Sequence, residues 1–405
     1  MLRPHTLVAL PGLLMIPLLG TFAVQASAAA PASGLTAAAP HILWSPAGPP
    51  GAARQGAPTA AAPQPATTNN LVFHGGAVLH HPHVYITFWG SQWDGLTVTS
   101  PQGVIYTAAT IQAYETGFFS NIGGTAWHGT QSQFCDGIQA GSLDCSTAAG
   151  ASQFVTNETG LLAGVWVDDS AAAPTEIATT GLGENVTQDP VATEAVRATN
   201  HFTPSGFDQD GVYFVFTPPQ TAATAYGTAY CAYHSEVTNT AQPGQHGIKY
   251  SFMPFTPSQG AGCGGNSVNA TDDAFGHGYL DSYTLAGGHE FEEAVTDPDA
   301  SPTQDGWNDA STSENGDKCA YFSTANLHIG ALYWAVQPMW SNEANGGQGG
   351  CAMARGTGSA PVPPPPNTIV PPSNVAEAPG AALLALVPLC VGGLLVRGRR
   401  LRRRR

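Results

Sequence analysis

The stretch VYITFW, residues 84–89, decides the fold class of this chain. β-Branched and aromatic residues favour an extended strand. Because side chains alternate along a strand, Val84, Ile86 and Phe88 fall on one face. Other apolar stretches are bounded by glycine, aspartate or proline, as buried strands are. They cover residues 161–167 and 212–216, and a further strand is expected at residues 248–252.

Helix signals lie between these strands. Asp189-Pro190 combines a capping residue with a first-turn proline and predicts a helix through about Asn200. Another helix is expected from Asp281 to Thr296, where Asp297-Pro298 ends it. Two more elements are expected: a helix within residues 103–122, and a short strand pair at 71–73 and 77–79. The alternation predicts an α/β or α+β fold, with a single mixed sheet and flanking helices.

The N-terminus has the features of a secretory signal peptide over residues 1–28. A weakly basic start precedes a mostly apolar stretch, and Ala26-Ser27-Ala28 forms a small-x-small cleavage site. Residues 29–70 are rich in alanine and proline and almost free of charge, which predicts a flexible or extended linker. We expect the globular ectodomain at residues 71–355.

The C-terminus has the features of a stalk, a membrane span and a tail. Residues 356–377 are proline-rich and predict a polyproline-type stalk. Residues 378–396 carry no charge and are just long enough for one transmembrane helix. Seven arginines within residues 397–405 place this tail on the cytoplasmic side. The chain is therefore expected at the outer face of the membrane or on the cell surface.

The layout of this C-terminus resembles the PEP-CTERM type of bacterial sorting signal. It departs from that type in reading Ala376-Glu377-Ala378-Pro379 in place of Pro-Glu-Pro. Permanent anchoring, and cleavage with transfer to a surface carrier, both stay open.

Acidic residues dominate the chain between the signal peptide and the span. All 28 aspartates and glutamates lie there against five basic residues, a net charge of −23. Such a surface repels nucleic acid, so we expect no nucleic-acid partner. The expected partners are an extracellular polymer, a peptide or a cell-wall component, with the membrane contacted through the C-terminal helix.

Six cysteines lie in the expected ectodomain, and an even count in an exported chain predicts three disulfides. Neighbouring cysteines bracket loops that contain glycine. We therefore predict sequential pairing: Cys135 with Cys145, Cys231 with Cys263, and Cys319 with Cys351. The chain has no C-x-x-C motif, which disfavours a cysteine-ligated zinc site.

The segment GGHEFEEAVTDP, residues 287–298, carries the strongest chemical signal. Positions four apart share a helix face, so His289 and Glu293 can ligate one zinc ion. Glu290 beside them is the candidate catalytic base. The pattern is that of the H-E-x-x-H helix of zinc peptidases, with glutamate in place of the second histidine. Alternatively, the glutamates form a solvated helix face and His289 is structural.

A third ligand is expected downstream, in a polar and acidic stretch. Glu314 lies 25 residues beyond His289, similar to the spacing of the third ligand in thermolysin-like peptidases. Asp317 follows shortly after and is also a candidate, and a disulfide at Cys319 would hold this loop still. The same carboxylates could instead hold calcium, although the spacing is not that of an EF-hand loop.

Three segments together resemble the Exordium, or phosphate-induced protein 1, family and its bacterial relatives. They are residues 73–76 with 84–90, residues 211–217, and the helix with its downstream Gly306-Trp307 and Glu314 to Cys319. The resemblance covers most of residues 70–325 in patches. It implies an extracellular or wall-associated protein and leaves catalysis open.

These features give two functional hypotheses. The first is an exported, surface-anchored, zinc-dependent hydrolase of the peptidase type, with His289, Glu293 and Glu314 or Asp317 as metal ligands and Glu290 as the base. The second is a non-catalytic surface or wall-interaction protein whose acidic loop is structural or binds calcium.

Overall fold

The structure is a computed structural model that describes residues 35–37, 41–44, 70–177, 189–223, 226–239, 247–299 and 305–355. The predicted signal peptide, stalk, span and basic tail lie outside these residues. Among the helices of the described ranges, none combines the length and the apolar character that crossing a membrane requires.

A mixed sheet of seven strands forms the centre of the described chain. Four strands run parallel: β12 (Ile248–Met253), β9 (Gly211–Phe216), β4 (His83–Trp89) and β7 (Leu162–Asp168). Strand β11 (Tyr230–Asn239) pairs antiparallel with β12. Beyond β11 lie β1 (Leu35–Ala37) and β2 (His41–Trp44), both antiparallel to it.

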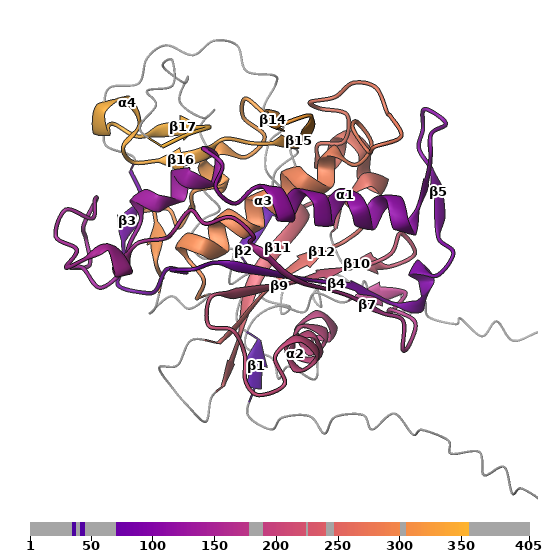
Figure 1. Ribbon diagram of the computed structural model, residues 1–405, viewed down its shortest axis with the longest axis horizontal. Coiled ribbons are helices and arrows are strands. Elements are labelled where there is room, and N and C mark those ends of the chain that lie inside the picture. Colours follow the sequence, from indigo (N-terminus) through magenta and orange to yellow (C-terminus); the bar gives the residue numbers. More distant parts are fainter. Residues whose placement is uncertain are drawn as a thin grey trace, which may run out of the picture. The chain divides into compact units, whose positions relative to one another are not determined.

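Helices cover both faces of this sheet (Figure 1). Helix α2 (Pro190–Phe202) packs on one face, and α1 (Ala108–Asn121) and α3 (Asp281–Thr296) pack on the other. Strand β9 shows why two cores form. Val212, Phe214 and Phe216 join the core under α1 and α3, and Tyr213 and Val215 join the core under α2. The result is a three-layer α/β arrangement.

Short elements surround these layers. Two C-terminal hairpins lie above α3, on the side away from the sheet (Figure 1). They are β14 (Ala325–Ile329) with β15 (Leu332–Val336), and β16 (Met339–Ser341) with β17 (Gly350–Ala352). The others are β3 (Val72–Phe73), β5 (Thr97–Thr99), β6 (Ile105–Thr107), β8 (Glu176–Ile177), β10 (Ala222–Ala223), β13 (Trp307–Asn308), α4 (Ala344–Gly347), and the 3₁₀ helices η1 (Ser91–Trp93), η2 (His128–Gln133), η3 (Ala151–Gln153), η4 (Thr256–Cys263) and η5 (Asp317–Cys319).

Most predicted elements are confirmed. The strands expected at residues 84–89, 161–167, 212–216 and 248–252 are β4, β7, β9 and β12, and the helix expected at 281–296 is α3. The capping prediction also holds. The Asp189 side chain accepts hydrogen bonds from the amides of Val191 and Ala192, at 2.9 and 3.0 Å.

Three expectations need correction. The helix expected from residue 103 begins at Ala108, because Ile105–Thr107 pairs with β5 as a strand. Residues 77–79 do not pair with 71–73; β3 pairs with β13 instead. The linker expected at residues 29–70 contains β1 and β2, because the exposed edge of β11 offers backbone partners to an extended segment.

All three predicted disulfides are present. Cys135 bonds to Cys145, Cys231 to Cys263, and Cys319 to Cys351. They tie loops to the core, and they are consistent with an oxidising, extracellular environment.

Candidate metal centre

Helix α3 supplies the first side chains of the candidate site. His289 and Glu293 lie one turn apart on the helix, and Glu290 is beside them. His289 and Glu290 have no exposed surface, and Glu293 is 1% exposed. Strands β11 and β12 cover one side of α3, and β15 covers another. These glutamates therefore do not form a solvated helix face.

His289, Glu293 and Asp317 form a group that could hold one metal ion. His289 Nε2 lies 2.9 Å from Glu293 Oε1 and 3.8 Å from Asp317 Oδ1. Helix η5 begins at Asp317, whose amide donates a 2.8 Å hydrogen bond to Glu293 Oε1. Tetrahedral ligands at about 2 Å from zinc are about 3.3 Å apart. The spacing of these three side chains is close to that value.

His234 of strand β11 connects this group to two others. Its Nε2 lies 3.7 Å from Glu293 Oε2 and 3.4 Å from Glu314 Oε2. It forms one group with Glu290 and Glu293, and another with His41 and Glu314. His41 Nδ1 lies 2.6 Å from Glu314 Oε2. We call the whole set the metal-site cluster: His41, His234, His289, Glu290, Glu293, Glu314 and Asp317.

The metal-site cluster concentrates four carboxyl groups with three imidazoles. Burial and neighbouring carboxylates raise the pKa values of Glu290 and Asp317 well above their usual range. Burial also disfavours the charged forms of Glu314 and His41. Even so, His41 and His234 lower the pKa of Glu314 to about 2, and Glu314 raises the pKa of His41 to about 10. His41 and Glu314 are therefore an ion pair, whereas the raised pKa values of Glu290 and Asp317 favour the protonated forms of these two carboxyls.

Several atoms of the cluster point at one another without bonding. Six buried atoms of the cluster have no hydrogen-bond partner of normal geometry among the described residues. They are both Glu290 oxygens, both His289 ring nitrogens, Glu293 Oε2 and Glu314 Oε1. Buried polar atoms without partners cost free energy. His289 Nε2 and Glu293 Oε1 are 2.9 Å apart yet do not have hydrogen-bond geometry. Donor atoms that face a common point in this way fit a metal ion.

The loop that carries Asp317 is fixed by hydrogen bonds to α3. The Asn315 side-chain amide donates hydrogen bonds to the Glu292 backbone carbonyl at 2.9 Å and to the Thr296 hydroxyl at 3.0 Å. The Gln337 side chain donates to the Gly316 carbonyl at 2.8 Å. The disulfide at Cys319 closes the other end of the loop. These contacts hold the loop against α3 and fix the position of Asp317, as a metal ligand requires.

Other acidic residues of this stretch have structural partners. Asp309 pairs with Lys318 at 2.6 Å. Asp297 accepts hydrogen bonds from the Gly306 amide at 2.6 Å and from the Asn308 side chain at 3.2 Å. These bonds occupy carboxylate oxygens that a calcium loop would use as ligands. The oxygen donors closest to His289 are instead those of the metal-site cluster.

The predicted site residues all fall in this one cluster. The structure brings His289, Glu293 and Asp317 together and places Glu314 with His41 and His234. Sequence reasoning missed both His41 and His234. The signal for His41 was the apolar run HILW in an otherwise alanine- and proline-rich segment. His234 lies in YCAYHSEVTN, where polar residues obscure the strand pattern.

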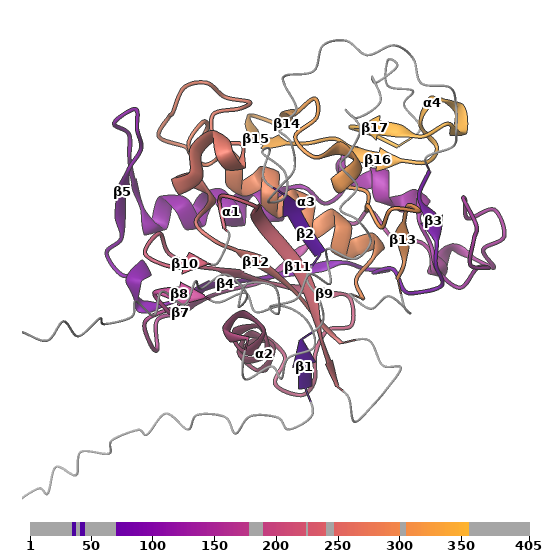
Figure 2. The same ribbon diagram turned by 180° about the vertical axis from the view of Figure 1, so that it is seen from behind.

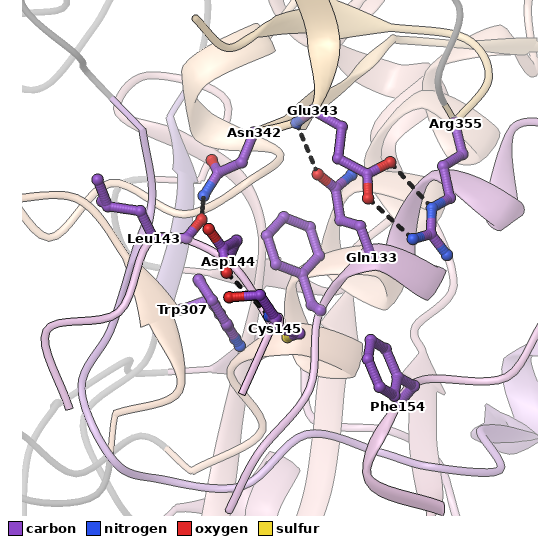
Figure 3. Close-up of a pocket in the computed structure, with 11 residues that line it drawn as sticks. Gln133, Leu143, Asp144, Cys145, Phe154, Trp307, Asn342, Glu343 and Arg355 are labelled. Atoms are coloured by element: carbon purple, nitrogen blue, oxygen red, sulfur yellow. Dashed lines mark hydrogen bonds and ion pairs between the residues drawn. The ribbon is translucent and has the colours of Figure 1, made fainter. Parts of the chain in front are cut away.

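A separate pocket of about 310 Å³ lies near the Cys135–Cys145 disulfide (Figure 3). Phe154 and Trp307 contribute aromatic walls. At its rim, Arg355 pairs with Glu343, with nitrogen–oxygen distances of 2.8 and 3.0 Å. None of the residues that line it belongs to the metal-site cluster. This pocket and the metal-site cluster are therefore separate features of the described residues.

Comparison with known proteins assigns no family and no function to this chain. No family model, curated protein or solved structure matches the chain. The resemblance to the Exordium family stays a prediction.

Proposed function

We propose that this protein is an exported, surface-held, zinc-dependent hydrolase of the peptidase type. One observation carries the proposal: His289, Glu293 and Asp317 converge, and both His289 ring nitrogens and Glu293 Oε2 are buried without hydrogen-bond partners among the described residues. Imidazole with carboxylate is a donor set that suits zinc, whereas calcium takes oxygen ligands.

Each residue has a distinct role in this proposal. His289, Glu293 and Asp317 hold the zinc ion, which when bound would lower the pKa of a coordinated water. Glu290 acts as the general base, because its buried carboxyl group lies beside His289 on α3 and forms one group with Glu293 and His234. His234 Nε2, at 3.7 Å from Glu293 Oε2 and 3.4 Å from Glu314 Oε2, positions these two carboxylates.

The proposed location rests on the sequence together with the disulfides. Three disulfides support an oxidising compartment. The signal peptide and the C-terminal span or sorting helix are sequence predictions. A site held outside the cell would act on external peptides or polymers, or on cell-wall components.

Metal analysis of the purified protein tests the proposal. We expect about one zinc per chain, as in a mononuclear site. His289→Ala should abolish both zinc binding and hydrolysis of a peptide substrate.

The matched control is His128→Gln. His128 pairs with Glu292 of the same helix at 2.9 Å and is equally buried, but it lies outside the metal-site cluster. It should keep its zinc. If the folded wild-type protein takes up no zinc at neutral pH, the proposal is wrong. If it binds calcium at the metal-site cluster, the non-catalytic alternative is favoured.

A further inference from the structure

Two strands from residues 35–44 cover the edge of the sheet beside the metal-site cluster. Strand β2 pairs antiparallel with β11 in a register that sets His41 opposite His234 and Leu43 opposite Ala232. Strand β1 continues along the same edge, with Leu35 opposite Asn239. Figure 2 shows β2 beside β11 and next to α3. This segment therefore occupies the one edge of the sheet that borders the candidate ligands.

The segment also reaches the cluster with its own groups. His41 is paired with Glu314 at 2.6 Å, and its ring lies 4.6 Å from that of His234, centroid to centroid. The Leu43 side chain is fully buried. His289 and Glu290 have no exposed surface in this arrangement. The elements that pack against α3 and bury these two residues include β2.

The position that the segment occupies suits an extended polypeptide. An edge strand offers a row of backbone amides and carbonyls, which bind any extended peptide by strand addition. Those bonds do not depend on the side chains of the incoming strand. Residues 35–44 belong to the alanine- and proline-rich stretch that precedes the expected ectodomain. Strands β1 and β2 within it are additions to the sheet beyond β11 and not part of the β4–β9 core.

We propose that β11 is the strand on which this protein binds an extended polypeptide substrate, and that residues 35–37 and 41–44 occupy it as a built-in competitor. The proposal rests on the proposed function, since it names the substrate class of that site. A tethered competitor acts at an effective concentration on the order of millimolar. It therefore suppresses substrate binding until the segment leaves the edge.

The test uses the full chain, zinc-loaded, and two variants of the segment. Leu43→Pro disrupts strand pairing, because the proline ring and its fixed backbone angle fit poorly within a ladder. His41→Ala removes the ion pair with Glu314 and leaves the backbone unchanged. The control is His81→Ala, which removes an exposed histidine–glutamate pair of similar length, 2.8 Å, away from the cluster.

The probe is a fluorescent peptide with the sequence AAPHILWSPA, residues 38–47. Leu43→Pro should bind it at least about tenfold more tightly than the wild type, a difference of about 1.4 kcal/mol. His41→Ala should show a smaller gain, and His81→Ala none. Hydrogen exchange of the β11 amides, followed by mass spectrometry, should be slow in the wild type and faster in Leu43→Pro. The same peptide with proline at the leucine position should not bind.

The outcomes separate this inference from the proposed function. Fast exchange of the β11 amides in the wild type, or no gain in peptide binding by either segment variant, would overturn the inference even if zinc binds. If the variants bind the peptide but the protein takes up no zinc, the proposed function fails and strand addition at β11 is supported.

Discussion

At the scale of single residues, Glu293 links the two halves of the metal-site cluster. Its Oε1 faces His289 and accepts the Asp317 amide, and its Oε2 faces His234. A histidine at this position would present one ligand nitrogen, whereas a carboxylate presents two oxygens. Glutamate in place of the second histidine of the zinc motif therefore has a structural consequence. The Glu293 side chain contacts His289 of α3, Asp317 of the loop and His234 of strand β11.

Gly316 gives the sharpest test at this scale. Its φ of −75° is open to any residue, so its backbone does not require glycine. The lack of space around Gly316 does require glycine, because a Cβ would lie 2.8 Å from Glu293 Oε1 and 2.9 Å from His289 Nδ1. We expect Gly316→Ala to weaken zinc binding at least about tenfold by displacing these ligands, and to lower the free energy of unfolding by about 1–3 kcal/mol through overpacking. Zinc titration and urea unfolding measure the two effects.

Gly150→Ala is the matched control for Gly316→Ala. Its backbone is extended, with a φ of −176°, and a Cβ there meets nothing within 4 Å. Both measurements should match the wild type. Unchanged zinc affinity in Gly316→Ala would show that His289 and Glu293 do not share a metal ion.

At the scale of elements, the pair Gly287-Gly288 explains how α3 packs so closely. Glycine costs a helix interior about 1 kcal/mol relative to alanine. A Cβ on Gly288 would lie 3.0 Å from Trp127 and 3.2 Å from Phe118 of α1, whereas one on Gly287 would make ordinary contacts at 3.4 Å and beyond. Only Gly288 leaves no room for a side chain.

The two glycines should therefore respond oppositely to alanine. Gly287→Ala should raise the free energy of unfolding by up to about 1 kcal/mol, from helix propensity. Gly288→Ala should lower it by about 1–2 kcal/mol, because overpacking against two aromatic rings exceeds that gain. Urea unfolding of the two variants measures the difference. Equal stabilities would mean that the Phe118 and Trp127 rings yield without cost.

The same scale shows which elements the sequence could predict. Strands β4 and β9 are largely apolar runs, and β12 alternates Ile248, Tyr250 and Phe252 with polar residues. Helix α3 ends at an Asp-Pro pair, so the strand and helix signals were both clear. Strand β11 was missed because His234, Ser235 and Glu236 interrupt its apolar pattern, and His234 is part of the candidate site. Local rules fail where side chains serve a site and not the core. Strand β2 was missed because its pairing comes from the edge of β11, a partner about 190 residues away.

At the scale of the whole molecule, buried carboxyl groups should govern how stability depends on pH. Glu115 of α1 is fully buried, and within the described part of the chain neither of its oxygens has a hydrogen-bond partner. Burial raises the pKa of Glu115 well above its usual value of 4.5. The folded state therefore holds a proton that the unfolded state releases above about pH 4.5. The stabilising contribution of this proton is complete at lower pH and declines as the pH rises.

We expect Glu115→Gln to remove this decline. The wild type should lose stability relative to the variant as the pH rises from 5 to 8, by up to about 1.4 kcal/mol per pH unit for one proton. Urea unfolding of both proteins at several pH values gives the difference, in which titration of the metal-site cluster cancels. Glu158→Gln is the control: Glu158 is more than half exposed, and its pKa is lowered by a hydrogen bond from His81, so its effect has the opposite sign and is screened by solvent. A difference between wild type and Glu115→Gln that does not change with pH would show that Glu115 is charged in the folded protein and has found a partner.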